Sequence, residues 1–524
     1  MPAATYDAIP YRSVPFPQTR PERLAGIARI FGLESPPIET ARVLELGCGS
    51  GGNIIALAND YPKARFLGID SSAVQIADGW TTIEALGFKN IQLKHRDILA
   101  LGADLGEFDY IICHGVFSWV PQPVQERILE ICRQNLAPNG VAYVSYNTYP
   151  GWHIRGIVRD MMCYHGMQFH DLSTRLVQAK ALVQFVADTG KLQDGPYKRL
   201  LRDEFEIIAG ADASYLHHEH LEENNRPIYF HEFARMLAVN GLQYLGEAEF
   251  STMISTNFAP ETAETLNKLG AHDILQMEQY MDYVRCRYFR QTLVCRRAVT
   301  LQRQLSAEVV GDWFLSSRAK PTVAEPAFDP SEVVEFKAPG AGLNCRSPLT
   351  KAALVELARE WPLPIRFDEL FDRAMASAAA RNFPMEVAGA RAFFAGEMLS
   401  GMAAGIVEWQ LSPVNFTTTI GERPLASRLA RHQAVASGSV ANLRGEPVNL
   451  DEIHRHILRK LDGETDRGQI VEYLLSQLQS GALVLRREGD DAPVTDEVEQ
   501  RELLIPALEK ALENLARLAL LAPA

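Results

Sequence analysis

Three groups of residues able to hold a nucleoside-like cofactor follow one another in the first hundred positions. The first is the segment Glu45-Leu46-Gly47-Cys48-Gly49-Ser50-Gly51-Gly52, in which a carboxylate precedes closely spaced glycines. Such glycines let the backbone pass close to a ligand in conformations that a Cβ would forbid. Asp70 follows after about twenty residues, a spacing typical of a carboxylate that accepts both ribose hydroxyls. Asp97 is then placed for the exocyclic amine of adenine, and the Ile98 backbone N–H for the adenine ring.

This order of groups indicates S-adenosylmethionine (SAM), which carries an adenosine, a sulfonium and an amino acid tail. Glu45 is placed to attract the ammonium of that tail. A glycine-rich turn alone is a weak signal, and a domain for NAD or FAD is the first alternative. Dinucleotide sites prefer Gly-x-Gly-x-x-Gly/Ala, however, whereas this turn reads Glu-x-Gly-x-Gly-x-Gly. A degenerate fold that binds no SAM is the second alternative, and the presence of all three carboxylates argues against it.

His114 ends the fourth expected strand, where it should lie beside the methyl donor. The predicted cofactor-binding residues are Glu45, Gly47, Cys48, Gly49, Gly51, Asn53, Asp70, Ser71, Asp97, Ile98 and His114.

Aromatic residues gather where the methyl acceptor should bind, near the ends of the fourth and fifth strands. Tyr146, Asn147, Tyr149, Trp152 and His153 fall within eight positions. Such a cluster can orient an amine by hydrogen bonds and accept a cationic product on its ring faces. Simple core packing is the alternative. The predicted acceptor-site residues are Tyr146 and Tyr149 as orienting hydroxyls, His153 as a proton relay, and Trp119, with Trp152, as a wall.

The segment His217-His218-Glu219-His220 invites a metal interpretation. It lacks the His-Glu-x-x-His spacing, and adjacent histidines point in different directions on a helix, so we expect no metal. Glu219, Glu222 and Glu223 are predicted to lie at the mouth of the active site and to favour a cationic acceptor. A solvated helix face is the alternative for these three residues.

Strands and helices alternate over most of the first 300 residues, which predicts a doubly wound, Rossmann-like α/β fold with a seven-stranded sheet. The last strand looks antiparallel. The expected strands are Arg42 to Gly47, Ala64 to Asp70, Ile91 to Asp97, Tyr110 to His114, Gly140 to Tyr146, Leu242 to Phe250 and Phe289 to Arg297, with helices such as Gln75 to Leu86, Gln125 to Leu136 and His231 to Asn240 between them.

The alternation breaks after Tyr146, where helical segments without strands indicate an insertion. Beyond Leu301, linkers rich in Pro, Gly and Ala precede two mainly helical modules. We therefore expect a SAM-binding domain at 1–153 and 228–300, a helical insertion for dimerisation or capping at 154–227, a middle helical domain at 301–420, and a helical or winged-helix-like domain at 421–524.

The composition limits location and partners. Fifty-two basic and 65 acidic side chains give a net charge of −13, which disfavours nucleic acid and suits a cationic partner. Seven scattered cysteines suit a reducing cytoplasm. We expect neither a secretion signal nor a membrane span, because no basic start with an apolar run and no long apolar stretch occurs.

Several passages resemble a bacterial family of class I SAM-dependent methyltransferases with a methyltransferase regulatory domain, a group that includes rickettsial protein-lysine methyltransferases. The resemblance spans most of residues 10 to 300 and extends to the Leu461-Asp462-Gly463 turn. The passages are Pro15-Phe16-Pro17-Gln18-Thr19, His114-Gly115-Val116-Phe117-Ser118-Trp119-Val120, Ser145-Tyr146-Asn147-Thr148-Tyr149-Pro150-Gly151-Trp152, His218-Glu219-His220-Leu221-Glu222, Tyr229-Phe230-His231-Glu232-Phe233 and Arg287-Tyr288-Phe289-Arg290-Gln291-Thr292-Leu293.

This resemblance implies SAM binding, a helical insertion used for dimerisation and, in some members, a lysine-rich protein substrate. The leading hypothesis is accordingly a protein-lysine N-methyltransferase that forms a homodimer. A small-molecule methyltransferase is the second hypothesis. A regulatory or scaffolding protein that senses SAM is the third.

Overall fold

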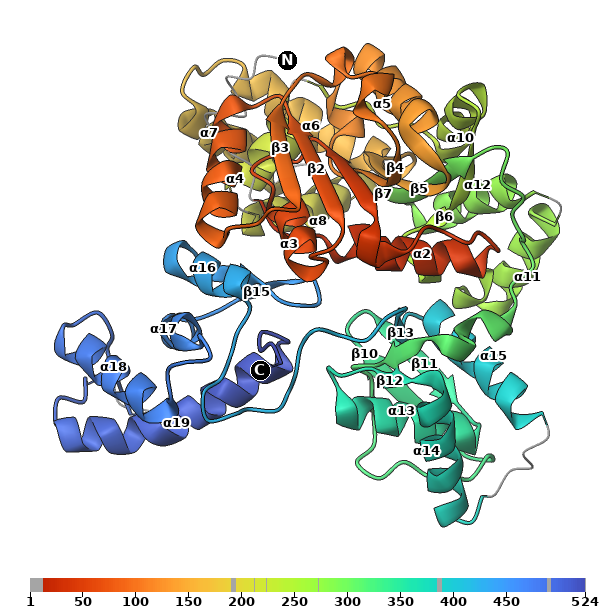
Figure 1. Cartoon of the computed structure of the whole chain (residues 1–524). Helices are drawn as coiled ribbons and strands as arrows, with labels where there is room; N and C mark the ends of the chain where they lie inside the picture. Colours follow the sequence, from red (N-terminus) through yellow and green to blue (C-terminus); the bar gives the residue numbers. More distant parts are fainter. Residues whose placement is uncertain are drawn as a thin grey trace.

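The computed structural model describes residues 13–189, 195–211, 213–222, 224–271, 273–383, 389–487 and 492–523. Its largest unit contains a seven-stranded sheet in the order β3-β2-β1-β4-β5-β7-β6 (Figure 1). Strands β1 to β5 are parallel, and β7 runs antiparallel to both β5 and β6, as the sequence predicted. The strands are β1 Arg42–Leu46, β2 Arg65–Asp70, β3 Ile91–His95, β4 Phe108–Cys113, β5 Leu136–Asn147, β6 Leu242–Glu247 and β7 Phe289–Arg296.

Helices cover both faces of this sheet because residues along each strand alternate between the faces. Val43 of β1 packs on the side of α2, α3 and α4, while its neighbour Leu44 packs on the side of α5 and α10. The doubly wound α/β class is therefore confirmed. The helices of this unit are α2 Pro21–Ile30, α3 Gly52–Asp60, α4 Ala73–Leu86, α5 Gln122–Asn135, α10 Phe230–Val239, α11 Pro260–Leu269 and α12 Ile274–Arg285.

Local signals set the ends of α4, which borders the predicted cofactor site. Ser72 caps its first turn by accepting a hydrogen bond from the Gln75 backbone N–H, and Gly87 ends it in the left-handed conformation. The preceding strand ends at Asp70, so the β2–α4 turn is short and holds Asp70 at the carboxyl edge of the sheet.

The insertion is helical and has its own core, which includes Val158, Met162, Val183, Leu201 and Ile208. Its last element is a π-helical turn, a feature found frequently at functional sites. The elements are α6 Gly151–Gly166, α7 Leu172–Asp188, α8 Pro196–Gly210, α9 Ala213–Leu216 and η6 His217–Leu221.

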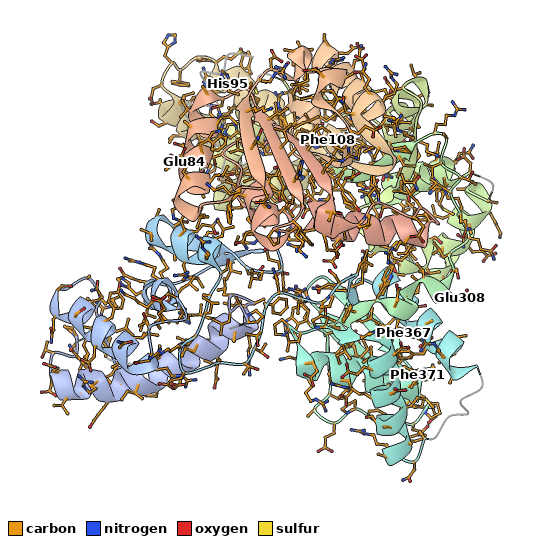
Figure 2. The ribbon with its side chains drawn as sticks, in the orientation of Figure 1. Glu84, His95, Phe108, Glu308, Phe367 and Phe371 are labelled. Atoms are coloured by element: carbon orange, nitrogen blue, oxygen red, sulfur yellow. The ribbon has the colours of Figure 1, made fainter. Side chains whose placement is uncertain are left out.

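The C-terminal half forms two lobes beside the sheet domain, teal and blue in Figure 1. The middle lobe contains more strand than the sequence predicted, because its strands span only two to five residues and leave little periodic signal. Phe367 and Phe371 of α14 both pack on Phe394 of α15 there (Figure 2). Its elements are β8 Phe314–Ser316, β9 Lys320–Pro321, β10 Val334–Ala338, β11 Ala341–Cys345, α13 Pro348–Glu360, β12 Ile365–Arg366, α14 Phe367–Ala380, α15 Ala390–Ala403 and β13 Glu408–Gln410.

Both lobes contact the first domain. The Glu22 carboxylate on α2 accepts hydrogen bonds from the Leu411 and Ser412 backbone N–H groups, and the middle lobe shares one continuous core with the sheet domain. Arg428 in turn donates to the Leu86 carbonyl at the end of α4. The C-terminal lobe consists of α16 Arg428–Ala436, β14 Ser439–Ala441, β15 Pro447–Asn449, α17 Glu452–Lys460, α18 Arg467–Gln479 and α19 Glu497–Arg517.

None of the helices in the described ranges is long and apolar enough to cross a membrane.

Candidate active site

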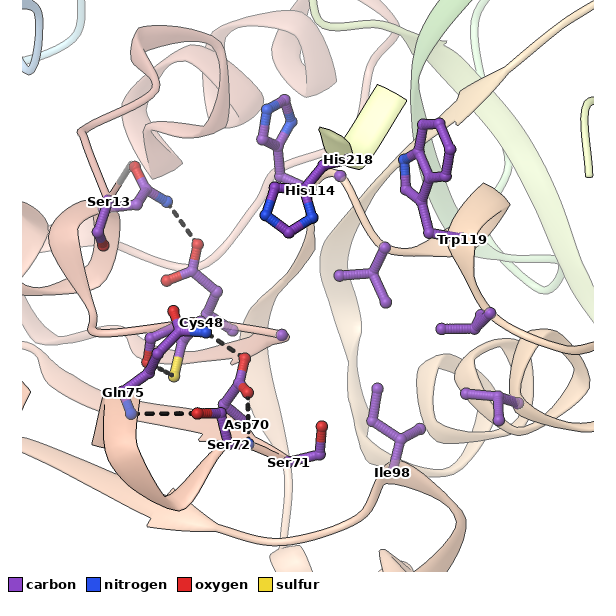
Figure 3. A pocket seen from close by; sticks show the side chains of 18 of the residues that line it. Ser13, Cys48, Asp70, Ser71, Ser72, Gln75, Ile98, His114, Trp119 and His218 are labelled. Atoms are coloured by element: carbon purple, nitrogen blue, oxygen red, sulfur yellow. Dashed lines mark hydrogen bonds between the residues drawn. The ribbon is translucent and has the colours of Figure 1, made fainter. Parts of the chain in front are cut away.

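A cavity of about 390 Å³ lies at the carboxyl edge of the sheet. Figure 3 shows Cys48, Asp70 and Gln75 on one side of it and Trp119 on the other, with His114 between them. The structure thus brings most of the predicted cofactor residues together around one space. The predicted residues in its lining are Glu45, Gly47, Cys48, Gly49, Asn53, Asp70, Ser71, Asp97, Ile98, His114 and Trp119.

The glycine loop has backbone conformations and close contacts that exclude side chains. Gly47 has a φ of +74°, and a Cβ there would lie 2.3 Å from Val116 Cγ2. Gly49 has a φ of +54°, and its Cβ would lie 2.8 Å from Gln75 Oε1. Gly51 differs from these two, because it caps α3 in the left-handed conformation and is not part of the cavity lining. Gly51 was predicted to contact the cofactor, but the structure places it at the start of α3 and outside the cavity lining.

Asp70 and Asp97 are both held by backbone N–H groups. Asp70 Oδ2 accepts from the Gly49 N–H and Oδ1 from the Ser72 N–H, each at 2.8 Å. Asp97 Oδ1 accepts from the Leu99 N–H at 2.9 Å. These bonds fix the direction of each carboxylate, and the oxygens keep further lone pairs with which to accept hydroxyl or amine hydrogens.

Glu45 is buried beneath the glycine loop with one oxygen engaged. Its Oε1 accepts from Asn53 Nδ2 at 2.8 Å, while Oε2 is buried and has no hydrogen-bond partner within the described ranges. Burial raises the pKa of Glu45 to about 8, although Asn53 acts in the opposite direction. An unpartnered carboxylate oxygen in a cavity lining fits a ligand that brings an ammonium group.

His114 is a neutral ring. Its Nδ1 is 2.9 Å from the Tyr143 hydroxyl, and its ring centroid lies 4.0 Å from that of Phe16. Burial lowers the pKa of His114 to about 4. At neutral pH this histidine therefore presents an uncharged aromatic surface to the cavity.

Sequence reasoning missed the N-terminal segment that closes one side of the site. Ser13, Val14 and Phe16 line the cavity. Ser13 Oγ accepts from the Gly52 N–H at 2.6 Å, and the Phe16 N–H donates to Asn53 Oδ1 at 2.9 Å. Asn53 thus joins this segment to Glu45. The available signal was the Pro15 to Thr19 motif, which contributed to the family resemblance without being assigned to the site.

Tyr146 does not face the cavity. It is 1% exposed on the opposite face of the sheet from Tyr143, and its ring packs against Phe233 and Phe117. The physical reason is strand alternation: Tyr143 and Ser145 point toward the cavity side, so Tyr146 points away. The sequence prediction that Tyr146 faces the methyl group is therefore corrected.

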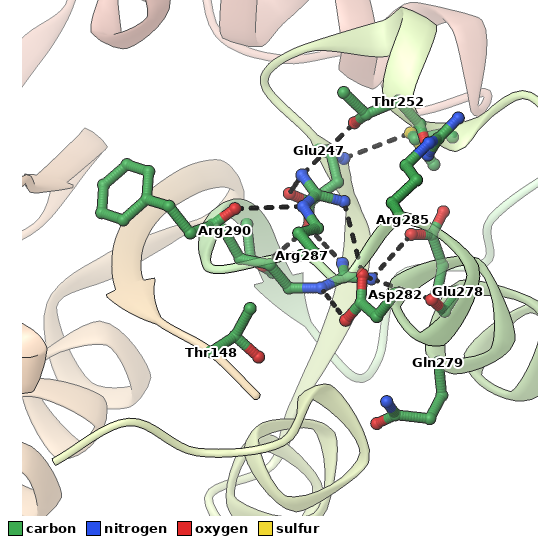
Figure 4. A network of polar contacts seen from close by, with 12 residues as sticks. Thr148, Glu247, Thr252, Glu278, Gln279, Asp282, Arg285, Arg287 and Arg290 are labelled. Atoms are coloured by element: carbon green, nitrogen blue, oxygen red, sulfur yellow. Dashed lines mark hydrogen bonds and ion pairs between the residues drawn. The ribbon is translucent and has the colours of Figure 1, made fainter. Parts of the chain in front are cut away.

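The Tyr146 hydroxyl instead lies at the end of a buried ionic network. Figure 4 shows the centre of this network, where Arg290 meets Glu247, Glu278 and Asp282. The Tyr146 hydroxyl lies 3.2 Å from Thr292 Oγ1, which donates to Glu247. Arg290, fully buried, pairs with Glu247 at 2.7 Å and also with Glu278 and Asp282. This network connects β6, β7 and α12 and stabilises the last two strands of the sheet.

Tyr149 and His153 also lie outside the cavity lining. Their rings stack with centroids 4.0 Å apart, and His153 Nε2 is 3.1 Å from the Tyr229 hydroxyl. Trp152 is the connection to the cavity, because its ring meets that of Trp119 edge-on at 6.2 Å. The predicted role of Trp119 as a wall therefore fits its position, whereas Tyr149 and His153 belong to a neighbouring aromatic cluster.

The π-helical turn η6 reaches the cavity from the insertion. His218 and Glu219 line it, and Glu223 lies outside the described residues. Potential ligand atoms of His217, His218 and Glu222 lie within 4.8 Å of one another, closer than expected for adjacent histidines that point in different directions. The absence of a metal remains a prediction.

Three stretches of the chain match protein families. Residues 43–140 match a family described as "Methyltransferase domain", residues 212–296 "Predicted methyltransferase regulatory domain", and residues 422–520 "PKMT, C-terminal winged helix domain". The uncharacterized protein RP789 of Rickettsia prowazekii is 34% identical over 522 residues, which cover 97% of this chain and 93% of the relative. The structure of PKMT2 from Rickettsia typhi in complex with AdoHcy matches with a TM-score of 0.87 and 32% identity, over 98% of this chain and all of PKMT2.

The chain belongs to this family of SAM-dependent methyltransferases. Within this methyltransferase, the stretch that matches the regulatory domain includes η6, β6 and β7. It therefore completes the sheet and also contributes His218 and Glu219 to the cavity.

Proposed function

We propose that this chain transfers the methyl group of SAM to lysine side chains of a protein. The support is its similarity to PKMT2, whose structure contains AdoHcy, the demethylated form of SAM, and its match to the PKMT winged-helix domain. PKMT denotes a protein-lysine methyltransferase.

The residues around the cavity fit SAM. We assign Glu45 to its ammonium, Asp70 to the ribose hydroxyls, and Asp97 with the Ile98 N–H to adenine. Gly47 and Gly49 let the ligand approach the backbone, and Cys48, Asn53 and Ser71 line the same part of the cavity. We call these residues, together with Glu45, Asp70, Asp97 and Ile98, the cofactor cradle. When bound, SAM supplies a methyl group made electrophilic by its sulfonium, and transfer is an in-line displacement in which positioning contributes most.

One observation carries the proposal: the cavity that holds this cradle continues to a second group of residues suited to an acceptor. Trp119 and Val120 form an apolar wall there, and His218 and Glu219 come from η6. An aromatic wall with a nearby carboxylate suits a long aliphatic side chain that ends in a cation.

We further propose that the protein acts as a homodimer in the bacterial cytoplasm. We expect it neither to bind nucleic acid nor to associate stably with membranes. The insertion exposes apolar side chains that a second copy would cover, among them Tyr164 and Met167 at 70%, Val177 at 62% and Phe185 at 68%. All seven cysteines are free thiols, and the net charge is −13. Light scattering at micromolar concentration tests the dimer, which a monomer would contradict.

Incubation with methyl-labelled SAM and a bacterial lysate tests the function. Label that enters protein supports the proposal. Label that enters only small molecules favours a small-molecule methyltransferase, and SAM binding without any transfer favours a sensing role.

A further inference from the structure

Glu219 is a carboxylate that the cofactor cradle does not use. It lies on η6 and lines the same cavity as Glu45 and Asp70, but it comes from the insertion rather than from the sheet. Together with His218, it is what the described residues of the insertion contribute to the cavity lining.

No charged partner holds this carboxylate in the described part of the chain. Among the residues that the structure describes, none forms a hydrogen bond or an ion pair with Glu219, and burial and the charge of Arg155 are the influences on its pKa. Arg155 of α6 is the cation that influences it, but the Arg155 guanidinium lies 3.8 Å from the centroid of the Tyr288 ring. The other titratable neighbours are Tyr215 on α9 and His218 on η6 itself. A carboxylate without an ion-pair partner is stabilised strongly by a cation that enters the cavity.

We propose that Glu219 receives the ε-ammonium of the acceptor lysine and accepts a proton from it. The inference rests on the proposed function. In this step one N–H bond of the ammonium breaks and one O–H bond forms on Glu219, which leaves a neutral amine whose lone pair is free to attack. A free lysine ammonium has a pKa of about 10.4, so without such a partner little neutral amine exists at neutral pH.

The proton-binding properties of the site agree with this assignment. Burial raises the pKa of Glu219 to about 7, although Arg155 opposes the rise. A general base whose pKa is near the working pH is deprotonated in a large fraction of molecules and still binds a proton well. His114 is a poorer candidate because burial lowers its pKa to about 4 and its Nδ1 already contacts Tyr143. Tyr149 and His153 lie outside the cavity lining.

The test compares Glu219→Gln with the matched control Glu206→Gln, which makes the same change at an exposed position of α8. Each full-length variant is incubated with methyl-labelled SAM and the same bacterial lysate, and methyl-lysine is counted after acid hydrolysis. At about pH 7 we expect Glu219→Gln to lose about a hundredfold or more in rate, while Glu206→Gln matches the wild type. The SAM dissociation constant should stay unchanged, which shows that the variant is folded.

The pH profile separates proton acceptance from simple packing. For Glu219→Gln the rate should rise about tenfold per pH unit between about pH 7 and pH 9, as the free amine fraction grows. The wild-type rate should level off above about pH 7. Glu219→Asp should recover part of the loss. A wild-type rate in Glu219→Gln, or a deficit that does not change with pH, overturns the inference. A wild-type chain that forms no methyl-lysine overturns the proposed function as well, so the two failures are distinguishable.

Discussion

The Gly49 backbone N–H donates a hydrogen bond to Asp70 Oδ2 at 2.8 Å, so the proposed ribose ligand also fixes the glycine loop. The Asp70→Ala variant should therefore bind SAM more weakly for two reasons. It loses the ribose contact, worth about 1.5 to 3 kcal/mol for hydrogen bonds to a charged group, and it loosens the loop. Calorimetry measures the dissociation constant. Asp78→Ala on the exposed side of α4 is the control, and an unchanged constant in a folded Asp70→Ala variant would exclude Asp70 as the ribose ligand.

Gly49→Val should abolish SAM binding, because Gly49 lines the cavity with a φ of +54° and a side chain there would block the approach of the ligand to the backbone. Gly87→Val is the matched variant, since Gly87 has a φ of +66° with open space around its Cβ. It should lose stability from backbone strain and still bind SAM. Thermal unfolding and calorimetry on both variants measure the two effects. SAM binding retained by Gly49→Val would refute the assignment of the loop.

Glu45 should make both stability and SAM affinity depend on pH. Burial raises the pKa of Glu45 to about 8, so the folded, ligand-free chain keeps a proton there that the unfolded chain releases near about pH 4. The folded state then binds more protons between these two values, and the contribution of Glu45 to stability falls as pH rises through that window. Glu45→Gln should remove this component of the pH dependence of denaturant unfolding.

Binding of the SAM ammonium favours the ionised form of Glu45, so binding near neutral pH should release a proton. Calorimetry in buffers with different heats of ionisation detects that release. The same proton release in Glu45→Gln would show that another group is its source.

The sequence predicted the sheet well, because each strand and helix there has a clear period and ends at a turn residue. The cofactor site also follows directly from residue types and spacing, since Glu45 is the next-to-last residue of β1, Asp70 ends β2 and Asp97 follows β3. The N-terminal part of the site could not be found in this way, because Phe16 reaches the cavity from a coil segment whose position depends on tertiary contacts such as the bond from the Phe16 N–H to Asn53. Glu219 was predicted to lie at the mouth of the active site and lines the cavity, but the π-helical turn that holds it was not predicted. Tyr146 was assigned to the wrong side because proximity in sequence outweighed strand alternation.

Tyr146→Phe should reduce stability by about 0.5 to 1.5 kcal/mol, since its hydroxyl bonds Thr292 in the core, and should leave SAM affinity and methyl transfer unchanged. Tyr143→Phe offers the contrast, because it removes the contact with His114 at the cavity and should alter SAM affinity. Denaturant unfolding and single-turnover assays measure both. A large loss of turnover in Tyr146→Phe with unchanged stability would restore Tyr146 to the acceptor site.

Mass spectrometry of tryptic peptides, after incubation of the chain with SAM and a bacterial lysate, tests whether the chain methylates lysine. We expect peptides with one or more added methyl groups on lysine, abundant with the wild type and reduced with Asp70→Ala at a SAM concentration that does not saturate the variant. Methyl groups on residues other than lysine, or the same methyl-lysine peptides in equal amounts with Asp70→Ala, would contradict this expectation.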